Sequence, residues 1–548
     1  MRNIFCHCVI LVCLLCLASG EILAVESQAA KIPSTAFEKK PADASVNVKP
    51  RNQIDVLVMK QLDKKGLKPA PICSDAVFLR RVYLDLIGRI PLPIEINAFL
   101  KDTAKDKRAQ MIDKLLEDER FYDYQTMKWA DLLRIKSEFP INLWPKGAVV
   151  YHRWVRDQLR NHVPYDQFAR ELLTASGSNF RCGPANFYRA VASRDALSYA
   201  EAVGSVFLDI TTDTLSESQR KEFAQFFSRV AIKGTAQWKE EIVYWNRQPL
   251  ESDNVVFPDG TTGHIKAGQD PRAVFAKWLT RSDNPYFKTC VVNRIWSWLF
   301  GSEIVSGSLS GVGMKNFMIG MTQSDEPLVP GLLEYLADEL VQNNFDLLRV
   351  YRLILNSRTY QQSSIQKEYH ADAQKDFAVY PIRRIEAEVL QDMFIQIFKL
   401  QITYVSETPE PYAYIPSRQQ TVQLGDAGIT NSFLEMFGRA TRDTGTESDR
   451  NNDVTASQEL FFINSNEINQ WVQRKVRQTF SGGKFSRIDS QQLQGQLRFL
   501  WLSIVSRPPS QQELDYAVAL LKSSKSKIQV AEDLTWSLLN SKEFFCRH

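Results

Sequence analysis

The chain has 548 residues, of which 44% are hydrophobic and 11% are aromatic. This composition excludes a largely disordered or collagen-like chain, and the length suits roughly two to four domains. With 67 Lys and Arg against 63 Asp and Glu, the net charge of +4 is too balanced for a protein that binds nucleic acid by bulk charge. We therefore expect no nucleic-acid partner.

The first twenty residues have the pattern of a secretory signal peptide. Arg2 precedes an apolar run from residue 9 to residue 17, and Ala18 and Gly20 place small residues where signal peptidase reads the chain. The run is shorter than the ~20 residues of a transmembrane helix. We predict cleavage after Gly20, secretion or export to the periplasm, and no membrane span in the mature chain. Residues 21–50 are predicted to be a linker.

Four of the eight cysteines lie in this signal. The other four are Cys73, Cys182, Cys290 and Cys546. They are too scattered for a zinc ribbon, a haem-attachment motif or a thioredoxin-type pair, whereas one or two long-range disulfides remain open. The histidines are equally scattered, so we expect no metal site and no cofactor.

Residues 51–210 are predicted to form a helical domain. Ser74 caps a helix that ends at Gly88, and apolar residues on most of its sides indicate a position in a core. On this helix, Arg81 and Asp85 have the spacing of an ion pair. Further helices are expected at 94–101, 105–117, 121–136, 147–160, 165–174 and 195–208.

The second half is predicted to form another helical domain, at 270–548, after a connecting segment at 211–269. The segment combines a helix near 216–228, a strand-like run at 241–245 and a turn-rich stretch. Helices of the second domain are expected at 271–281, 285–300, 331–343, 346–357, 383–399, 455–473, 491–506, 510–523 and 528–541, with long loops at 301–330 and 402–454. The fold class is therefore mainly α: two helical domains joined by a mixed segment with a few short strands.

The signatures of common enzymes are missing from the sequence, so the catalytic residues stay unknown. Arginine next to aromatic residues is the first candidate binding pattern, at Arg294 with Trp296 and at Arg358 with Tyr360. A guanidinium beside an aromatic ring suits sugars and anions. The more common outcome is a buried ring beside an arginine that caps a helix or pairs with a carboxylate.

Charged residues of the second domain form the other candidates. Glu388 and Asp392 lie on one helix face, as paired carboxylates or as part of a salt-bridged surface. The loop at 437–450 is dense in Arg, Asp and hydroxyl groups, which suits a polar binding loop and a plain surface loop equally. The full set of binding candidates is Arg80, Asp85, Arg294, Trp296, Arg358, Arg384, Glu388, Arg439, Asp443, Asp449 and Arg450.

Long motifs resemble a known pair of domains. Residues 78–91, 129–134 and 164–168 resemble the planctomycete-type secreted domain of unknown function (PSCyt type) that is often found beside a cytochrome-c-like domain. The segments 270–272, 283–285, 292–296, 355–364, 383–388 and 538–545 resemble its usual C-terminal companion (PSD type). The resemblance implies export by planctomycete-like bacteria and genes near those of secreted sulfatase-like or phosphatase-like proteins. It implies no settled activity.

The chain departs from this family pattern at three places. After residues 206–208, typical members carry a C-x-x-C-H-N-H-P segment, where this chain has neither Cys nor His. Typical members carry a Cys-Glu-Cys-Glu-Arg run in the long loop, where this chain has Thr446-Glu447-Ser448-Asp449-Arg450. A His-containing turn before the helix at 331–343 is replaced by residues 327–330. Thiolate and imidazole are the groups that a redox centre or soft-metal site requires.

These departures favour a secreted, non-haem binding or scaffold protein that supports the processing of extracellular polysaccharide or sulfated glycans. The expected partner is a polysaccharide or a co-exported sulfatase-like or phosphatase-like protein. Two alternatives stay open. One is a hydrolase that uses carboxylates such as Asp85, Glu388 and Asp449 as acid and base. The other is a redox-associated protein.

Overall fold

The computed structural model describes residues 49–210, 215–249, 253–305, 327–366, 370–480 and 490–548. The predicted signal peptide, nearly all of the predicted linker and most of the loop predicted at 301–330 lie outside these residues. Residues 46–548 cluster into one compact unit.

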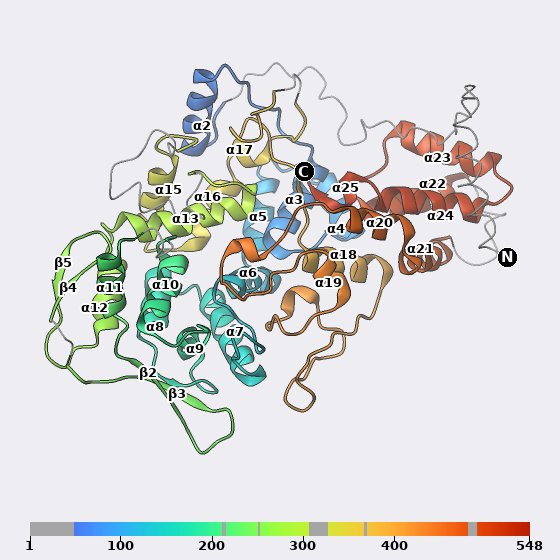
Figure 1. The fold of residues 1–548 in the computed structure, drawn as a ribbon. Helices are drawn as coiled ribbons and strands as arrows, with labels where there is room; N and C mark the ends of the chain where they lie inside the picture. The colour runs from blue at the N-terminus through green and yellow to red at the C-terminus, as the bar shows by residue number, and fades with distance from the viewer. Residues whose placement is uncertain (1–48, 211–214, 250–252, 306–326, 367–369, 481–489) are drawn as a thin grey trace, which may run out of the picture. The chain divides into compact units, whose positions relative to one another are not determined.

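Helices make up most of the described chain (Figure 1), which confirms the predicted mainly α class. In the first half they are α2 (Gln53–Lys64), α3 (Asp75–Ile87), α4 (Pro93–Lys101), α5 (Lys107–Leu116), α6 (Glu119–Leu132), α7 (Pro145–Arg160), α8 (Tyr165–Thr174), α9 (Asn186–Arg189), α10 (Ala196–Phe207) and α11 (Glu217–Gln225). In the second half they are α12 (Pro271–Leu279), α13 (Pro285–Phe300), α15 (Leu332–Gln342), α16 (Leu347–Leu355), α17 (Arg358–Gln361), α18 (Ala387–Phe398), α19 (Ser432–Met436), α20 (Ala456–Asn464), α21 (Asn466–Thr479), α22 (Ser490–Ile504), α23 (Gln511–Ser523), α24 (Lys527–Leu539) and α25 (Lys542–Phe545). Short 3₁₀ turns lie at Gly183–Ala185, Thr421–Gln423 and Glu447–Asp449.

The strands form three small antiparallel sheets. One has the order β1 (Gly177–Ser178), β3 (Glu241–Trp245), β2 (Val230–Gly234), and another pairs β4 (Asn254–Val256) with β5 (Thr262–His264). The third pairs β6 (Arg383–Arg384) with β7 (Cys546–Arg547), so that Arg383 lies opposite Arg547. This last pairing brings the end of the chain beside the start of α18.

Two predicted helices differ from the structure, one because of a contact with a distant segment and one because of a local cap. The helix predicted at 383–399 begins at Ala387, because Arg383 and Arg384 pair with β7 as a strand. The helix predicted at 455–473 is two helices, because the Ser465 hydroxyl accepts from the amides of Glu467 and Ile468 and so caps a new helix.

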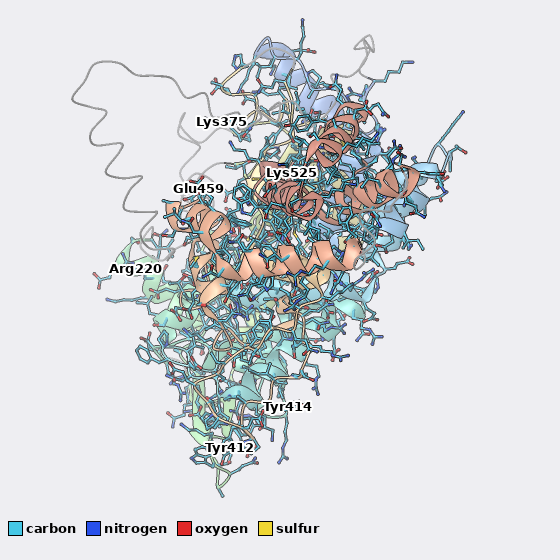
Figure 2. All side chains as sticks on the ribbon, turned by 90° about the vertical axis from the view of Figure 1, so that its right-hand side faces the viewer. Arg220, Lys375, Tyr412, Tyr414, Glu459 and Lys525 are labelled. Atoms are coloured by element: carbon cyan, nitrogen blue, oxygen red, sulfur yellow. The ribbon has the colours of Figure 1, made fainter. Side chains whose placement is uncertain are left out.

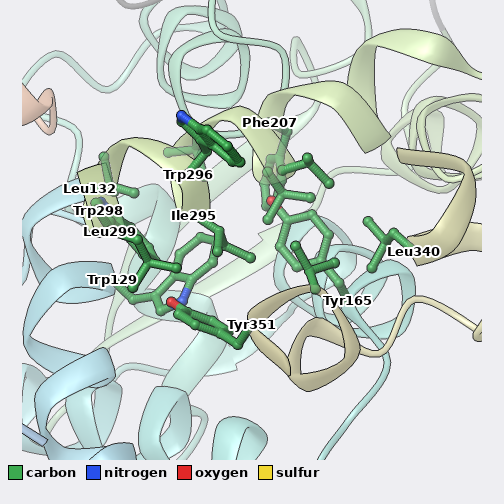
Figure 3. Packing of buried hydrophobic residues seen from close by; sticks show 14 of the residues in the cluster. Trp129, Leu132, Tyr165, Phe207, Ile295, Trp296, Trp298, Leu299, Leu340 and Tyr351 are labelled. Carbon is green, nitrogen blue, oxygen red and sulfur yellow. The ribbon is translucent and has the colours of Figure 1, made fainter. Parts of the chain in front are cut away.

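The buried apolar side chains gather in two clusters. The larger extends from α2 to the segment around residue 380 and includes α13, whereas the smaller extends from α18 to α25 and takes side chains from α3 and α6. Figure 3 shows the middle of the larger cluster, where Trp129 meets Trp298 with 5.6 Å between ring centroids. Both clusters thus combine segments from either side of residue 270. The predicted domain boundaries stay predictions.

Among the described residues, no helix combines the length and the apolar character that a membrane span requires.

Candidate functional site

Asp85 is the first of several buried charges that meet where α3, α6, α13 and α18 come together. Its side chain on α3 is fully buried. One carboxylate oxygen accepts from the hydroxyls of Tyr360, at 2.7 Å, and Tyr380, at 3.1 Å. The other accepts from Arg383 at 2.9 Å and lies 3.3 Å from the Nε of Arg547. Asp85 is thus fully engaged by hydroxyl and guanidinium groups.

Arg81, the expected partner of Asp85, has a different role. Its guanidinium donates to three backbone carbonyls, those of Tyr360, Gln362 and His548. The first two carbonyls lie in the segment after α16, and the third belongs to His548, the last residue of the chain. Arg81 therefore ties the C-terminus to α3 instead of pairing with the carboxylate one turn away.

Arg547 links this carboxylate to Glu386. It lies 2.5 Å from Glu386 and donates to the Tyr124 hydroxyl at 2.7 Å, which in turn donates to Glu386. Lys128, one turn further along α6, lies over the rings of Tyr124 and Trp298. Burial lowers the pKa of Lys128 to about 7 despite the acids around it.

Arg450 joins two further buried acids. It holds Glu388 through two hydrogen bonds of 2.6 and 2.9 Å and donates to Asp131 at 2.8 Å. Arg442 holds the other oxygen of Asp131 at 2.8 Å, and Arg439 lies 3.4 Å from Glu388. Burial alone would raise the pKa of Glu388, but Arg450 and Arg439 bring it down to about 2. The carboxylate is therefore ionised at any physiological pH.

Glu388 and Asp392, predicted as paired carboxylates, have separate partners. Asp392 accepts from the backbone amides of Thr421 and Val422, at 2.7 and 3.1 Å, and burial raises its pKa to about 6. Asp392 fixes the 3₁₀ turn that follows α18, whereas Glu388 belongs to the arginine network.

Arg294 on α13 brings together segments that are far apart in sequence. It donates to the carbonyls of Val206, at 2.7 Å, and Ser205, and its Nε lies 3.4 Å from Glu447. Trp298, one turn further on, donates its indole N–H to the same Glu447 oxygen at 3.1 Å. Burial raises the pKa of Glu447. The end of α10 and the loop at 446–450 thus meet on one side of α13.

Within that loop, the hydroxyl groups bond to one another. The Thr446 and Ser448 hydroxyl oxygens are 2.7 Å apart, and so are those of Thr444 and Thr446. Asp449 accepts from the Thr444 amide and hydroxyl, at 3.0 and 2.7 Å. The loop therefore satisfies its own polar groups while Glu447 and Arg450 reach into the buried network.

The other predicted binding residues lie apart from this network or in the core. Arg80 is buried and donates to Ser506 and to the Ile504 and Phe544 carbonyls. Trp296 is fully buried and stacks on Phe300, with 4.2 Å between ring centroids. Its ring therefore packs in the core, which is the alternative to ligand binding given for this pattern.

Arg384 donates to four backbone carbonyls, among them those of Phe437 and Asn451, and so holds the long loop. Arg358 is half-buried at the start of α17, where its amide donates to Asp55. Asp443 pairs with Lys136 at 2.7 Å.

The residues that complete the network were not among the predicted site residues. These are Tyr124, Lys128, Asp131, Arg383, Glu386, Arg442, Glu447 and Arg547. Several lie inside the motifs quoted for the family resemblance, but helix periodicity assigns them to faces without showing that the faces meet. Arg547 gave no signal at all, because its position depends on the β6–β7 pairing.

The cysteines and potential metal ligands are dispersed. Cys73, Cys182, Cys290 and Cys546 are all free thiols. Burial raises the pKa of Cys290 to about 12 and that of Cys546 to about 11. Within the part of the chain that the structure describes, no group of three or more His, Cys, Asp or Glu side chains is placed to hold a metal ion.

Comparison with known proteins gives the class of this chain. Residues 53–235 match the family model PSCyt2, a protein of unknown function (DUF1549), and residues 271–521 match PSD1, a protein of unknown function (DUF1553). The chain is a mainly α protein that pairs these two domains in this order, which confirms the resemblance seen in its motifs. No curated protein and no solved structure matches it.

Proposed function

We propose that this protein is an exported, non-haem binding or scaffold protein that supports the processing of extracellular polysaccharides, sulfated glycans among them. Its partner would be the polymer itself or a co-exported sulfatase-like or phosphatase-like protein. The support comes from the residues that occupy the three places where the chain departs from its family pattern.

Residues beside or within the three places contact helix α13 directly or through Ile304, while residues 211–214 of the first place lie outside the described residues. Arg294 contacts Val206 and Glu447, and the neighbouring Asn293 accepts from the Ile304 amide, whose own carbonyl accepts from Leu328. If the thiols and imidazoles of the family form one centre, this chain lacks the groups of the whole centre. In this chain, no thiol or imidazole stands at the residues quoted for them.

The loop at 446–450 is the single observation that carries the proposal. Its two charged residues that match the family run, Glu447 and Arg450, hold buried ion pairs. At the two thiol positions, the hydroxyls of Thr446 and Ser448 share a hydrogen bond of 2.7 Å. The loop thus keeps two charged residues in buried ion pairs, while hydroxyls stand where the family run carries the thiols that redox chemistry requires.

The contacts of the candidate acids oppose the hydrolase alternative. A general acid needs a proton near neutral pH and access to the substrate. Asp85 is fully buried among four donors, and Glu388 has a pKa of about 2. Asp449 is engaged by Thr444. These groups act as a rigid frame.

A binding survey tests the proposal. The purified protein is passed over immobilised polysaccharides, neutral and sulfated, and in parallel is used to capture co-exported proteins. We expect saturable binding to at least one of them. Absence of binding to every polysaccharide and every co-exported protein would contradict the proposal.

Two further measurements address the alternatives. A Soret band or stoichiometric iron in the purified protein would favour the redox alternative over ours. A hydrolytic activity that Asp449→Asn removes without unfolding the protein would favour the hydrolase.

A further inference from the structure

Three aromatic rings from separate segments form a cluster, which we call the aromatic platform. They are Trp144, just before α7; Trp238, in the turn between β2 and β3; and Tyr412, in the long loop after α18. Trp238 and Tyr412 are exposed and Trp144 is half-buried. Ring centroids are 4.9 Å apart for Trp144 and Trp238, 5.7 Å for Trp144 and Tyr412, and 5.4 Å for Trp238 and Tyr412. Each ring therefore touches the other two.

The platform is open to solvent. Trp238 is 60% exposed and Tyr412 51% exposed, and the nearby Tyr414 is 72% exposed. Figure 2 shows Tyr412 and Tyr414 together at the lower edge of the view, away from Lys525. Aromatic rings normally contribute to folding by burial, so a cluster with two exposed rings is a candidate interaction site.

The backbone holds the platform in a conformation that is costly for these residues. Trp144 has a φ of 64° and Lys239 a φ of 59°, in the left-handed region that favours glycine. Each such residue costs about 1–3 kcal/mol. The buried Asn179 fixes the turn, because its amide donates to the Lys239 carbonyl and its oxygen accepts from the Glu241 amide. The rings are thus positioned before any ligand arrives.

Lys239 supplies positive charge directly at the rings. Its ammonium lies 5.3 Å from the ring centroid of Trp144 and 5.8 Å from that of Trp238. The acidic neighbour Glu240 is occupied, because it accepts from the hydroxyls of Ser178 and Thr235. An anionic group above the platform would therefore meet Lys239 first.

This chemistry fits a polysaccharide better than a protein. The C–H face of a pyranose ring carries partial positive charge and stacks on the electron-rich face of an indole or phenol. Aromatic rings are enriched at protein interfaces as well, so the choice of a polysaccharide rests on the ammonium of Lys239 at the rings, which complements a sulfate or carboxylate substituent.

We propose that the aromatic platform binds an anionic polysaccharide, with sugar rings against Trp238 and Tyr412 and a sulfate or carboxylate substituent at Lys239. The proposal rests on the proposed function and gives it a site and a ligand class.

The test compares platform variants with matched controls on four polymers. Affinity electrophoresis measures the binding of Trp238→Ala, Tyr412→Ala and Lys239→Ala to carrageenan, which is sulfated, to alginate, which is carboxylated, and to the neutral polymers agarose and laminarin. Tyr516→Ala on α23 and Lys525→Ala remove an exposed ring and an exposed charge at other places. Circular dichroism confirms that each variant is folded.

We expect binding to carrageenan or alginate to exceed binding to agarose and laminarin. Trp238→Ala and Tyr412→Ala should each weaken it roughly tenfold, which corresponds to about 1.4 kcal/mol. Lys239→Ala should remove the preference for the anionic polymer, and the two controls should bind as the original protein does.

Three results would overturn the proposal, and they bear differently on the proposed function. Polysaccharide binding that is unchanged in all platform variants would refute the site and leave the proposed function standing. A protein that binds no polysaccharide but captures a co-exported protein through the platform would refute the ligand class alone. Equal binding to neutral and anionic polymers, insensitive to Lys239→Ala, would also refute it.

Discussion

Replacing Glu388 by Gln tests whether the buried arginine network is a structural frame. The substitution keeps the shape of the side chain but removes the charge that Arg450 holds through two hydrogen bonds. In the variant, Arg450 still pairs with Asp131, but this buried cation loses one of its two carboxylate partners. Breaking a buried pair in this way costs roughly 3–5 kcal/mol.

The lowered pKa of Glu388 gives a second value for the stability that its charge contributes. It falls from 4.5 to about 2 because the two arginines outweigh burial. Such a difference of about 2.5 between the unfolded and folded pKa corresponds to about 3 kcal/mol of stability. Since the folded pKa is depressed, this stability is complete well above pH 4.5 and is lost as the pH falls through about 2. By pH 3, about 2 kcal/mol of it should be gone.

Chemical denaturation followed by tryptophan fluorescence measures both effects. At pH 7, Glu388→Gln should lower the free energy of unfolding by roughly 3 kcal/mol or more. Between pH 7 and pH 3 both proteins lose stability, and the variant should lose about 2 kcal/mol less than the original protein because it lacks the Glu388 carboxylate. Glu459→Gln on α20 is the control, because Glu459 is exposed. A loss below about 1 kcal/mol at pH 7, or the same pH dependence with and without Glu388, would refute the reasoning.

Three further substitutions probe the buried network and the apolar core. Lys128→Met should increase stability at pH 6, because the folded state lowers the pKa of Lys128 to about 7 from 10.5 and so disfavours its charge. The original protein should gain stability relative to this variant between pH 7 and pH 9, and parallel pH curves would contradict the assignment. Arg547→Met leaves Asp85 and Glu386 short of a cation and should cost roughly 3–5 kcal/mol in denaturant titrations, against about 0.5 kcal/mol or less for the exposed Lys542→Met. Trp296→Ala should lower the free energy of unfolding by about 3–5 kcal/mol, because the indole is fully buried. Trp238→Ala removes an exposed ring and should change the unfolding midpoint little. Equal losses of stability in the two variants would contradict the difference in burial between the two rings.

Local signals in the sequence predict the helices well, because capping and periodicity act within one element. The helices predicted at 165–174 and 285–300 have the same bounds in the structure, and the strand-like run at 241–245 is β3. The wrong start predicted for α18 follows from a contact between distant segments. Arg383 and Arg384 become a strand only because the last residues of the chain pair with them.

The candidate site was predictable only in part for the same reason. Periodicity assigned Asp85 and Glu388 to helices that carry buried faces, but no local pattern shows that Arg547 reaches one and Arg450 the other. Arg81 and Asp85 have the spacing of an ion pair, but Arg81 donates instead to backbone carbonyls of distant segments. The aromatic platform was missed because its rings come from positions 144, 238 and 412, each unremarkable alone.

The most direct test of the account is the binding of the purified protein to carrageenan, with and without Trp238→Ala. We predict saturable binding that the substitution weakens roughly tenfold. A protein that binds neither this polymer nor alginate, and that captures no co-exported protein, would contradict both the binding function and its proposed site.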